Sequence, residues 1–306
     1  MRRRRPRNVP ASVRQRLLNR ARERREDFNY LLTRYANERL LYRLAASRHR
    51  DQFVLKGAVL FELWTSTAHR ATRDVDLLGC GEPAVAPVQA VFQDLCTLQV
   101  PPDGMRFLAG SVRAAPIRER QAESGIRVRL TADLDGARIS LQVDVGFGDV
   151  VTPRVVEAEF PTILDFPAPR LRTYPHEAVV AEKFEAMVRL GMANTRMKDF
   201  YDLWVMASSF AFCGKSLADA LAATFGSRGT PLPIDPPISL RSEFSADAAK
   251  QAQWTAFAGR SRLSAVPSLE TIVIVLRRIL WPPVSAVTHR IRFERDWPAG
   301  GDWMAS

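Results

Sequence analysis

The stretch Arg70-Ala71-Thr72-Arg73-Asp74-Val75-Asp76-Leu77-Leu78 decides the fold prediction, because two carboxylates stand in a short apolar segment. The pattern predicts a strand, in which alternate side chains point to opposite faces, so Asp74 and Asp76 would share one face about 7 Å apart. Two such charges repel each other unless a cation lies between them. Oxygen ligands suit Mg²⁺ or Mn²⁺, so the segment predicts a metal site. The alternatives are a solvated edge strand or an aspartate that caps a helix.

A further acidic position occurs in Ile139-Ser140-Leu141-Gln142-Val143-Asp144-Val145. The alternation predicts a strand with one apolar and one polar face, and Asp144 lies on the polar face. Residues 127–132 also alternate, and Asp135-Gly136 between the two segments predicts a hairpin turn. If strand 139–145 lies beside the first acidic strand, three carboxylates converge on one metal site. Otherwise Asp144 is a surface acid.

A lysine and a glycine precede the acidic strand, in Phe53-Val54-Leu55-Lys56-Gly57-Ala58-Val59-Leu60. The apolar residues predict a strand that turns into a helix at Lys56-Gly57. A glycine at such a turn allows a phosphate to approach backbone N–H groups, and Lys56 would add a cation. The other interpretation is a plain turn.

Two predicted helices later in the chain carry charged residues close to their apolar stripes. The first spans 176–190 and contains Lys183, one of only 5 lysines beside 39 arginines. A compact ammonium suits a triphosphate, although a lysine in this place also snorkels to solvent. The second helix spans 197–210, with Asp199 and Asp202 three residues apart on one face. Asp199 either stabilises the helix N-terminus or orients Lys183 or an attacking hydroxyl.

Helical patterns dominate both ends of the chain. Residues 11–47 predict one helix with Ser12 as its N-cap, and the last predicted helix, 268–280, stops at Trp281-Pro282-Pro283. Strands and helices mix in between. We therefore predict an α/β (α+β) protein with three parts: an arginine-rich helical segment (1–50), a core with a mixed sheet (51–168) and a helical C-terminal lobe (169–306) that completes the active-site cleft.

Composition excludes several classes of protein. With 46% hydrophobic and 25% charged residues, the chain is globular. No apolar run reaches the roughly 18–20 residues of a membrane helix, and no apolar segment follows the first arginines as in a secretory signal. Three cysteines without a CxxC pair fit neither a disulfide framework nor a zinc ribbon. We expect a cytoplasmic monomer that does not contact membranes.

The positive charge is concentrated at the N-terminus. The formal net charge is +11, yet the first 50 residues hold 16 arginines and 4 acids, so the remaining chain is almost neutral. Such a segment either follows the phosphates of a nucleic acid or is a solvated helix face.

Four of these segments occur in a fixed order: Leu55-Lys56-Gly57-Ala58, Arg70-x-Thr72-x-Asp74-Val75-Asp76, Ala181-Glu182-Lys183-Phe184-Glu185-Ala186 and Arg196-x-Lys198-Asp199-Phe200-Tyr201-Asp202-Leu203. Together they resemble the AbiEii/AbiGii (MenT-type) toxin family, a branch of the DNA polymerase β-like nucleotidyltransferase superfamily. The resemblance covers about residues 50–210. The family usually has Gly or Ser where this chain has Ala58.

The resemblance implies a polymerase-β-like nucleotidyltransferase core that uses an NTP and Mg²⁺ (or Mn²⁺). Asp74 and Asp76 would bind the metal, Lys183 would bind the triphosphate, and Asp199 would complete the catalytic site. Asp144 is the candidate third metal ligand, from its strand pattern and the wider superfamily. The nucleotide-binding candidates are Lys56, Gly57, Ala58, Arg70, Thr72 and Asp202, and Thr72 corresponds to a phosphorylatable hydroxyl in the family.

The resemblance also implies a biological role. The chain would be the toxin of a toxin–antitoxin or abortive-infection (phage-defence) system, with a cognate antitoxin. Some relatives add nucleotides to the 3′ end of tRNA and so inhibit translation, which makes tRNA, or another RNA, the favoured acceptor. The acceptor hydroxyl would attack the α-phosphorus, and catalysis would consist mainly of positioning and electrostatics. Two alternatives remain: the same fold nucleotidylates a protein or small molecule, or the chain is a non-enzymatic RNA-binding module.

Overall fold

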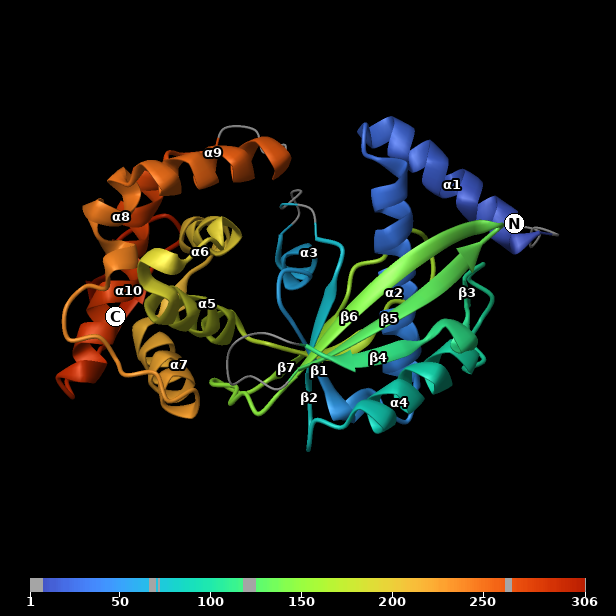
Figure 1. Ribbon diagram of the computed structural model, residues 1–306, viewed down its shortest axis with the longest axis horizontal. Helices are drawn as coiled ribbons and strands as arrows, with labels where there is room; N and C mark the ends of the chain where they lie inside the picture. Colours follow the sequence, from blue (N-terminus) through green and yellow to red (C-terminus); the bar gives the residue numbers. More distant parts are fainter. Residues whose placement is uncertain (1–7, 66–69, 71, 118–124, 262–265, 306) are drawn as a thin grey trace. The chain divides into compact units, whose positions relative to one another are not determined.

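The computed structural model describes residues 8–65, 70, 72–117, 125–261 and 266–305. The chain forms two compact units (Figure 1). The first unit comprises Met1–Gly148 and Val156–Thr173, and the second comprises Asp149–Val155 and Tyr174–Ser306. The predicted α/β class with a mixed sheet is confirmed.

A mixed sheet forms the centre of the first unit, in the order β3-β5-β6-β2-β1-β8-β7, with β4 also paired to β5. Strand β2 runs parallel to β6, and β1 runs parallel to β8. The other neighbouring strands are antiparallel. The strands are β1 (Phe53–Lys56), β2 (Val75–Gly79), β3 (Arg106–Phe107), β4 (Arg113–Pro116), β5 (Gly125–Leu134), β6 (Ala137–Phe147), β7 (Val156–Glu159) and β8 (Arg170–Thr173).

The hairpin of β5 and β6 confirms the alternating pattern of the sequence. Asp135 and Gly136 at its tip have φ values of 51° and 81°, the positive angles that a two-residue hairpin turn requires. One face of the hairpin is buried, through Ile126, Val128, Leu130, Ile139, Leu141, Val143 and Val145. The other face carries the polar residues, so burial fixes the register of the acid on β6.

The described helices of the first unit are α1 (Val9–Arg24), α2 (Phe28–Ala46), α3 (Leu60–Trp64) and α4 (Val85–Thr97). The prediction of one helix over 11–47 was wrong, because Arg25 adopts a left-handed φ of 55° and Asp27 caps a new helix by accepting from the Tyr30 N–H. The predicted N-cap was also wrong: Asn8, not Ser12, accepts the Ala11 N–H.

Arginines of α2 belong to the core of the first unit. Arg43 is 5% exposed and donates to both oxygens of Asp103. Arg39 is fully buried, pairs with Glu38 at 2.9 Å and donates to the Pro167 carbonyl. Both guanidiniums are therefore engaged inside the unit. The arginines at 2–7 lie outside the described residues.

The second unit is largely helical. Its helices are α5 (His176–Leu190), α6 (Met197–Ser209), α7 (Gly214–Ser227), α8 (Ser242–Ala246), α9 (Ala248–Ser261) and α10 (Leu269–Thr288). A small antiparallel sheet is formed by β9 (Phe212–Cys213), β10 (Arg295–Trp297) and β11 (Met304–Ala305). Short 3₁₀ turns in the two units span Arg50–Gln52, Ala109–Ser111, Gly191–Ala193 and Ile238–Leu240.

Helix α10 corrects a prediction, because it continues through Pro282 and Pro283 to Thr288. Two consecutive prolines lack the N–H groups that would bond to the carbonyls four residues earlier, those of Arg278 and Ile279. The indole N–H of Trp303 donates to both carbonyls, at 3.1 and 3.2 Å. A distant side chain thus supplies the donor that the helix lacks.

Among the described helices, α10 alone is long and apolar enough to cross a membrane by length and composition. Its apolar side is buried in the second unit, through Leu269, Ile272, Val273, Leu276, Ile279, Leu280 and Val284. This burial is that of a core helix.

Candidate active site

A row of charged residues crosses four strands of the sheet on one face. Lys56 of β1 is the cross-strand partner of Asp76 of β2, Asp76 is the partner of Asp144 of β6, and Asp144 is the partner of Arg127 of β5. Directly paired residues share a sheet face. The two acids that sequence reasoning assigned to separate segments are therefore neighbours, flanked by one cation on each side.

Gly57 lies against the carboxylate of Asp76. A Cβ atom on Gly57 would be 2.0 Å from Oδ2 of Asp76, and Gly57 has a φ of 76°. Both the conformation and the space exclude a side chain. The turn after β1 therefore brings bare backbone to the side of this acid, whereas Ala58, the next residue, is buried.

Asp74 precedes β2 and is exposed. Asp76 is half-buried within the strand, between the buried Val75 and Leu77. The segment before the strand is attached to α2, because the Asn37 amide donates to the Arg73 carbonyl at 2.9 Å. Arg70 and Thr72 of the same segment are half-buried.

Arg127 engages Asp144 through two hydrogen bonds. Its Nε and Nη2 atoms donate to the two carboxylate oxygens at 2.8 and 2.7 Å. Sequence reasoning missed Arg127, although the hairpin register around Asp135-Gly136 places it opposite Asp144 and contains the signal. In the structure, therefore, the guanidinium of Arg127 occupies both oxygens of Asp144, the carboxylate that we predicted as the third metal ligand.

The acids fit a metal site with two protein ligands. The described residues contain no group of three or more His, Cys, Asp or Glu side chains arranged for a metal. Mg²⁺ is usually held by one or two carboxylates together with substrate phosphates and water. Asp74 and Asp76 match that pattern in residue type, and Gly57 places backbone without a side chain beside the second carboxylate.

The second unit contains the other predicted residues, and Lys183 is their centre. Its Nζ donates to Oδ1 of Asp199 at 2.7 Å and to Oδ2 of Asp202 at 2.9 Å. Both aspartates are fully buried, and the lysine side chain is 11% exposed. Arg196 adds an ion pair to Asp199 at 2.6 Å. Of the two interpretations of Asp199, the contact with Lys183 is present, whereas the contacts of Asp202 and Arg196 were not predicted.

The charge state of Asp199 follows from these neighbours. Burial by itself would raise its pKa, but Lys183 and Arg196 together hold the pKa of this carboxyl below its ordinary value. Asp199 is therefore an anion at neutral pH, and it fixes the position of the lysine ammonium.

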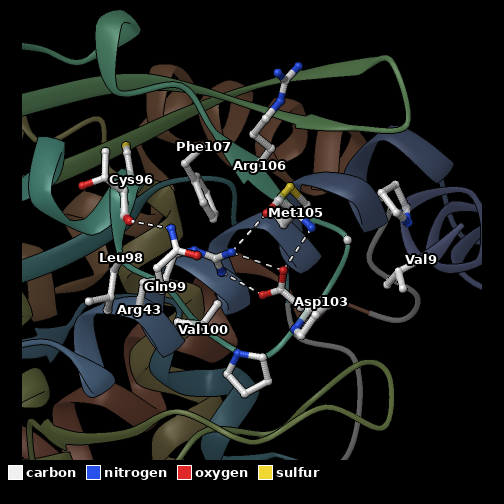
Figure 2. Close-up of a pocket in the computed structure, with 15 residues that line it drawn as sticks. Val9, Arg43, Cys96, Leu98, Gln99, Val100, Asp103, Met105, Arg106 and Phe107 are labelled. Carbon is white, nitrogen blue, oxygen red and sulfur yellow. Dashed lines mark hydrogen bonds and ion pairs between the residues drawn. The ribbon is translucent and has the colours of Figure 1, made fainter. Parts of the chain in front are cut away.

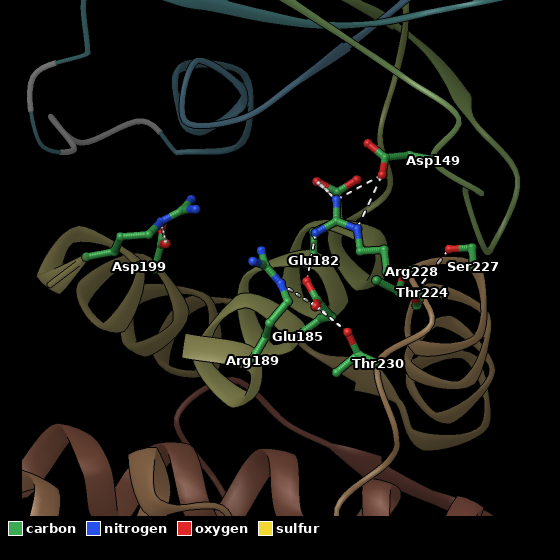
Figure 3. Close-up of polar contacts among 10 residues, drawn as sticks. Asp149, Glu182, Glu185, Arg189, Asp199, Thr224, Ser227, Arg228 and Thr230 are labelled. Atoms are coloured by element: carbon green, nitrogen blue, oxygen red, sulfur yellow. Dashed lines mark hydrogen bonds and ion pairs between the residues drawn. The ribbon is translucent and has the colours of Figure 1, made fainter. Parts of the chain in front are cut away.

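A second ionic network surrounds Arg228 (Figure 3). This residue was not identified from the sequence. Arg228 donates to Asp149 at 2.9 Å and to Glu185 at 2.9 Å, and lies 3.4 Å from Glu182. Burial would raise the pKa of Glu185, but hydrogen bonds from Thr230 and Arg228 hold it below its usual value. The network connects Asp149 and the end of α7 to the helix that carries Lys183. No local pattern marks Arg228 in the sequence.

A cavity of about 490 Å³ lies elsewhere in the first unit (Figure 2). It is lined by Val9, Arg43, Cys96 and the segment 97–107. Its main polar groups are already satisfied, because Arg43 donates to Asp103 and to the Met105 carbonyl. None of the predicted site residues lines it.

Comparison with known proteins shows that one protein-family model matches most of the chain. A family model described as "Nucleotidyl transferase AbiEii toxin, Type IV TA system" matches residues 39–275. The matched range includes every site residue that the sequence predicts. No curated protein matches the chain.

Two solved structures are similar to the chain. The structure of JHP933 from Helicobacter pylori has 14% sequence identity and a TM-score of 0.47, over 85% of this chain and 94% of that chain. That of a "putative nucleotidyltransferase" from H. pylori has 13% identity and a TM-score of 0.46, over 86% of this chain and 98% of that chain.

Proposed function

The chain belongs to the AbiEii nucleotidyltransferase toxin family of type IV toxin–antitoxin systems, and on this premise we propose that it transfers a nucleotide from an NTP to an RNA, with the 3′ end of tRNA as the favoured acceptor. The observation that carries this proposal is the charged row of β1, β2, β6 and β5, with bare backbone beside the Asp76 carboxylate.

Each residue of the first unit has a role in this proposal. Asp74 and Asp76 hold Mg²⁺ or Mn²⁺, and the bound ion supplies charge neutralisation of the triphosphate. Lys56, next to Asp76 in the row, offsets charge on the leaving pyrophosphate. Gly57 and Ala58 form the turn along which the phosphates lie, and Arg70 and Thr72 contact the nucleotide from the segment before β2. Asp144 orients Arg127 and serves as the third acid of the centre.

The proposal also assigns the buried centre of the second unit to nucleotide binding. Lys183 supplies a point charge for phosphate oxygens. Asp199 and Asp202 keep its ammonium in one position, so that little orientational freedom is lost when an anion binds. This assignment is supported by the order of the motifs in the sequence and by the three-way contact itself.

The biological setting follows from the family. As a toxin, the protein acts in the cytoplasm on RNA and is restrained by a cognate antitoxin. Modification of the tRNA 3′ end inhibits translation because that end accepts the amino acid. We also propose that the chain acts as a monomer.

The direct test is nucleotide transfer. The purified chain is incubated with bulk tRNA, Mg²⁺ and each of the four NTPs labelled at the α-phosphate, and RNA and protein are then separated. We expect label from one or more NTPs on RNA, and none with Asp74→Asn. Label on protein alone would show that the acceptor is a protein and not RNA. Equal labelling by the variant would refute the proposed centre.

A further inference from the structure

We propose that the exposed polar face of strands β4, β5 and β6 binds the sugar–phosphate backbone of the acceptor RNA. We define this arginine face by Arg113, Arg129 and Arg138, with the short polar side chains of Thr131, Ser140 and Gln142 between them. The inference rests on the proposed function, which supplies an RNA acceptor, and it names the surface that holds it.

The arginine face continues directly from the charged row. Cross-strand pairing places Gln142, Arg129 and Arg113 in the next row after Asp144 and Arg127. Thr131 and Ser140 form the following row, and Asp133, Arg138 and Arg106 form the last. Alternate residues of a strand share a face, so all these rows lie on the face of Asp76. From Asp144 to Arg138 the face extends about 20 Å, at roughly 3.3 Å per residue.

This face is exposed, whereas the opposite face forms the core. Arg113, Arg129, Arg138 and Ser140 are exposed, and the residues that alternate with them on β5 and β6 are buried. The exposed side chains therefore occupy a sheet surface that the described parts of the chain leave accessible.

The charge of the arginine face calls for an anionic partner. Beyond the charged row, this side of the sheet carries the three arginines of the arginine face, Arg106 at its end, and one acid, Asp133, which lies 3.6 Å from Arg106. Arg113 and Arg129 are direct cross-strand partners, and like charges in that position are destabilising. Within the described residues, neither Arg129 nor Arg138 is held in an ion pair. A bound phosphate relieves this repulsion, and the guanidinium fork matches its oxygens.

The composition of the face favours nucleic-acid backbone as the partner. The rows contain no aromatic side chain on which bases would stack. Arginine, threonine, serine and glutamine are the residue types that contact phosphate and sugar without reading sequence. If the 3′ end of an RNA lies at Asp76, the nucleotides that precede this end can contact the arginine face, because the face continues directly from the charged row. We therefore expect binding that depends strongly on salt and weakly on sequence.

Three arginines of the N-terminal segment, 1–50, are poorer candidates for this role. Arg34 donates to Glu62, Arg43 to Asp103 and Arg48 to Asp94. Because these guanidiniums are already engaged within the unit, an RNA phosphate would have to replace an existing carboxylate.

The test compares two double variants of equal charge. Arg129→Gln/Arg138→Gln neutralises the arginine face, and Arg277→Gln/Arg292→Gln removes two exposed arginines of the second unit as the control. Affinity for fluorescein-labelled bulk tRNA is measured by anisotropy over a salt series, and Mg²⁺–NTP binding and melting temperature are measured on the same preparations. We expect the first variant to bind tRNA at least about tenfold more weakly at low salt. Its plot of log affinity against log salt should be less steep by about 1.5, the slope of two lost phosphate contacts.

The inference is supported if NTP binding and melting temperature stay at wild-type values and the control binds tRNA normally. Wild-type tRNA affinity of Arg129→Gln/Arg138→Gln, or an equal loss in the control, overturns it. Loss of binding to the purified antitoxin with unchanged tRNA affinity also overturns it, and makes the face a protein interface. If the wild-type chain labels no RNA, the proposed function fails. If it labels RNA and the variant labels and binds RNA equally well, only the arginine face fails.

Discussion

The two charged centres of this protein differ in how far their acids are exposed to solvent. In the first unit, Asp74 is exposed and Asp76 is half-buried beside the backbone of Gly57. In the second unit, Asp199 and Asp202 are fully buried and both bind the ammonium of Lys183. The first centre thus keeps its acids accessible, and the second encloses its acids around a cation.

This difference predicts different consequences of mutation. Removal of an acid that is proposed to bind the metal and is at least partly exposed should reduce activity and leave the fold in place. Removal of one partner from a buried ion pair leaves an uncompensated charge, which destabilises the fold strongly. Substitutions of Asp76 and Lys183 separate these two outcomes most clearly.

The largest effect is expected from Asp76→Asn. Nucleotide transfer should fall by at least about 10³-fold, since the variant loses an anionic metal ligand at the reacting phosphates. The melting temperature should stay close to the wild-type value. Asp133→Asn, on the same sheet face, is the control and should retain transfer. A stable Asp76→Asn with normal transfer would remove Asp76 from the centre.

Lys183→Met tests the second centre. It leaves Asp199 and Asp202 buried without their lysine, so the free energy of unfolding should fall by about 3–5 kcal/mol. Urea denaturation measures this loss. Lys215→Met is the matched control, because Lys215 forms a solvent-exposed pair with Asp219, and exposed ion pairs contribute little to stability. Equal stability of the two variants would show that the buried pair has no structural role.

Gly57→Ala should affect both activity and folding in the first unit. The added Cβ would meet the Asp76 carboxylate, and a shift of about 1 Å in a catalytic group costs roughly 100-fold in rate. Gly136→Ala isolates the backbone contribution, because Gly136 has a similar φ of 81° with open space around it. Equal transfer rates for the two variants would contradict a specific role for the Gly57 contact.

His176→Phe should change how stability depends on pH. Burial lowers the pKa of His176, at the start of α5, from 6.5 to about 4. The unfolded chain therefore binds a proton between these values that the folded chain does not, so stability falls as pH decreases from 6.5 to 4, by up to about 3 kcal/mol. The phenylalanine variant, which can still pack on Phe210, should lose less stability over this range. Parallel melting curves for both proteins would refute the burial effect.

The features that the sequence predicts well are those with a local period. The alternation of β5 and β6, the Asp-Gly turn between them, and helices α5 and α6 follow from patterns of 2 and 3.6 residues. The prediction that the carboxylates converge required the Asp144 strand to lie beside the Asp76 strand. Strands β2 and β6 do pair, in parallel, and this pairing aligns Asp76 with Asp144. The family assignment also followed from spaced motifs.

The features that sequence reasoning missed depend on distant partners. The last helix continues through two prolines because Trp303 supplies hydrogen bonds from 20 residues further along the chain. The N-terminal helix breaks where Arg25 takes a left-handed conformation, which neighbouring residues do not specify. The buried pairs of Arg39 and Arg43, and the network of Arg228, require tertiary contacts that no local pattern encodes.

The central claim is that Asp76 belongs to the nucleotide-transferring centre and is dispensable for folding. The most direct measurement is transfer of α-labelled nucleotide to bulk tRNA by wild type and Asp76→Asn from parallel preparations, with a melting curve for each. We expect labelled tRNA with wild type, none with the variant, and overlapping melting curves. Labelling of tRNA by Asp76→Asn at the wild-type rate would contradict it.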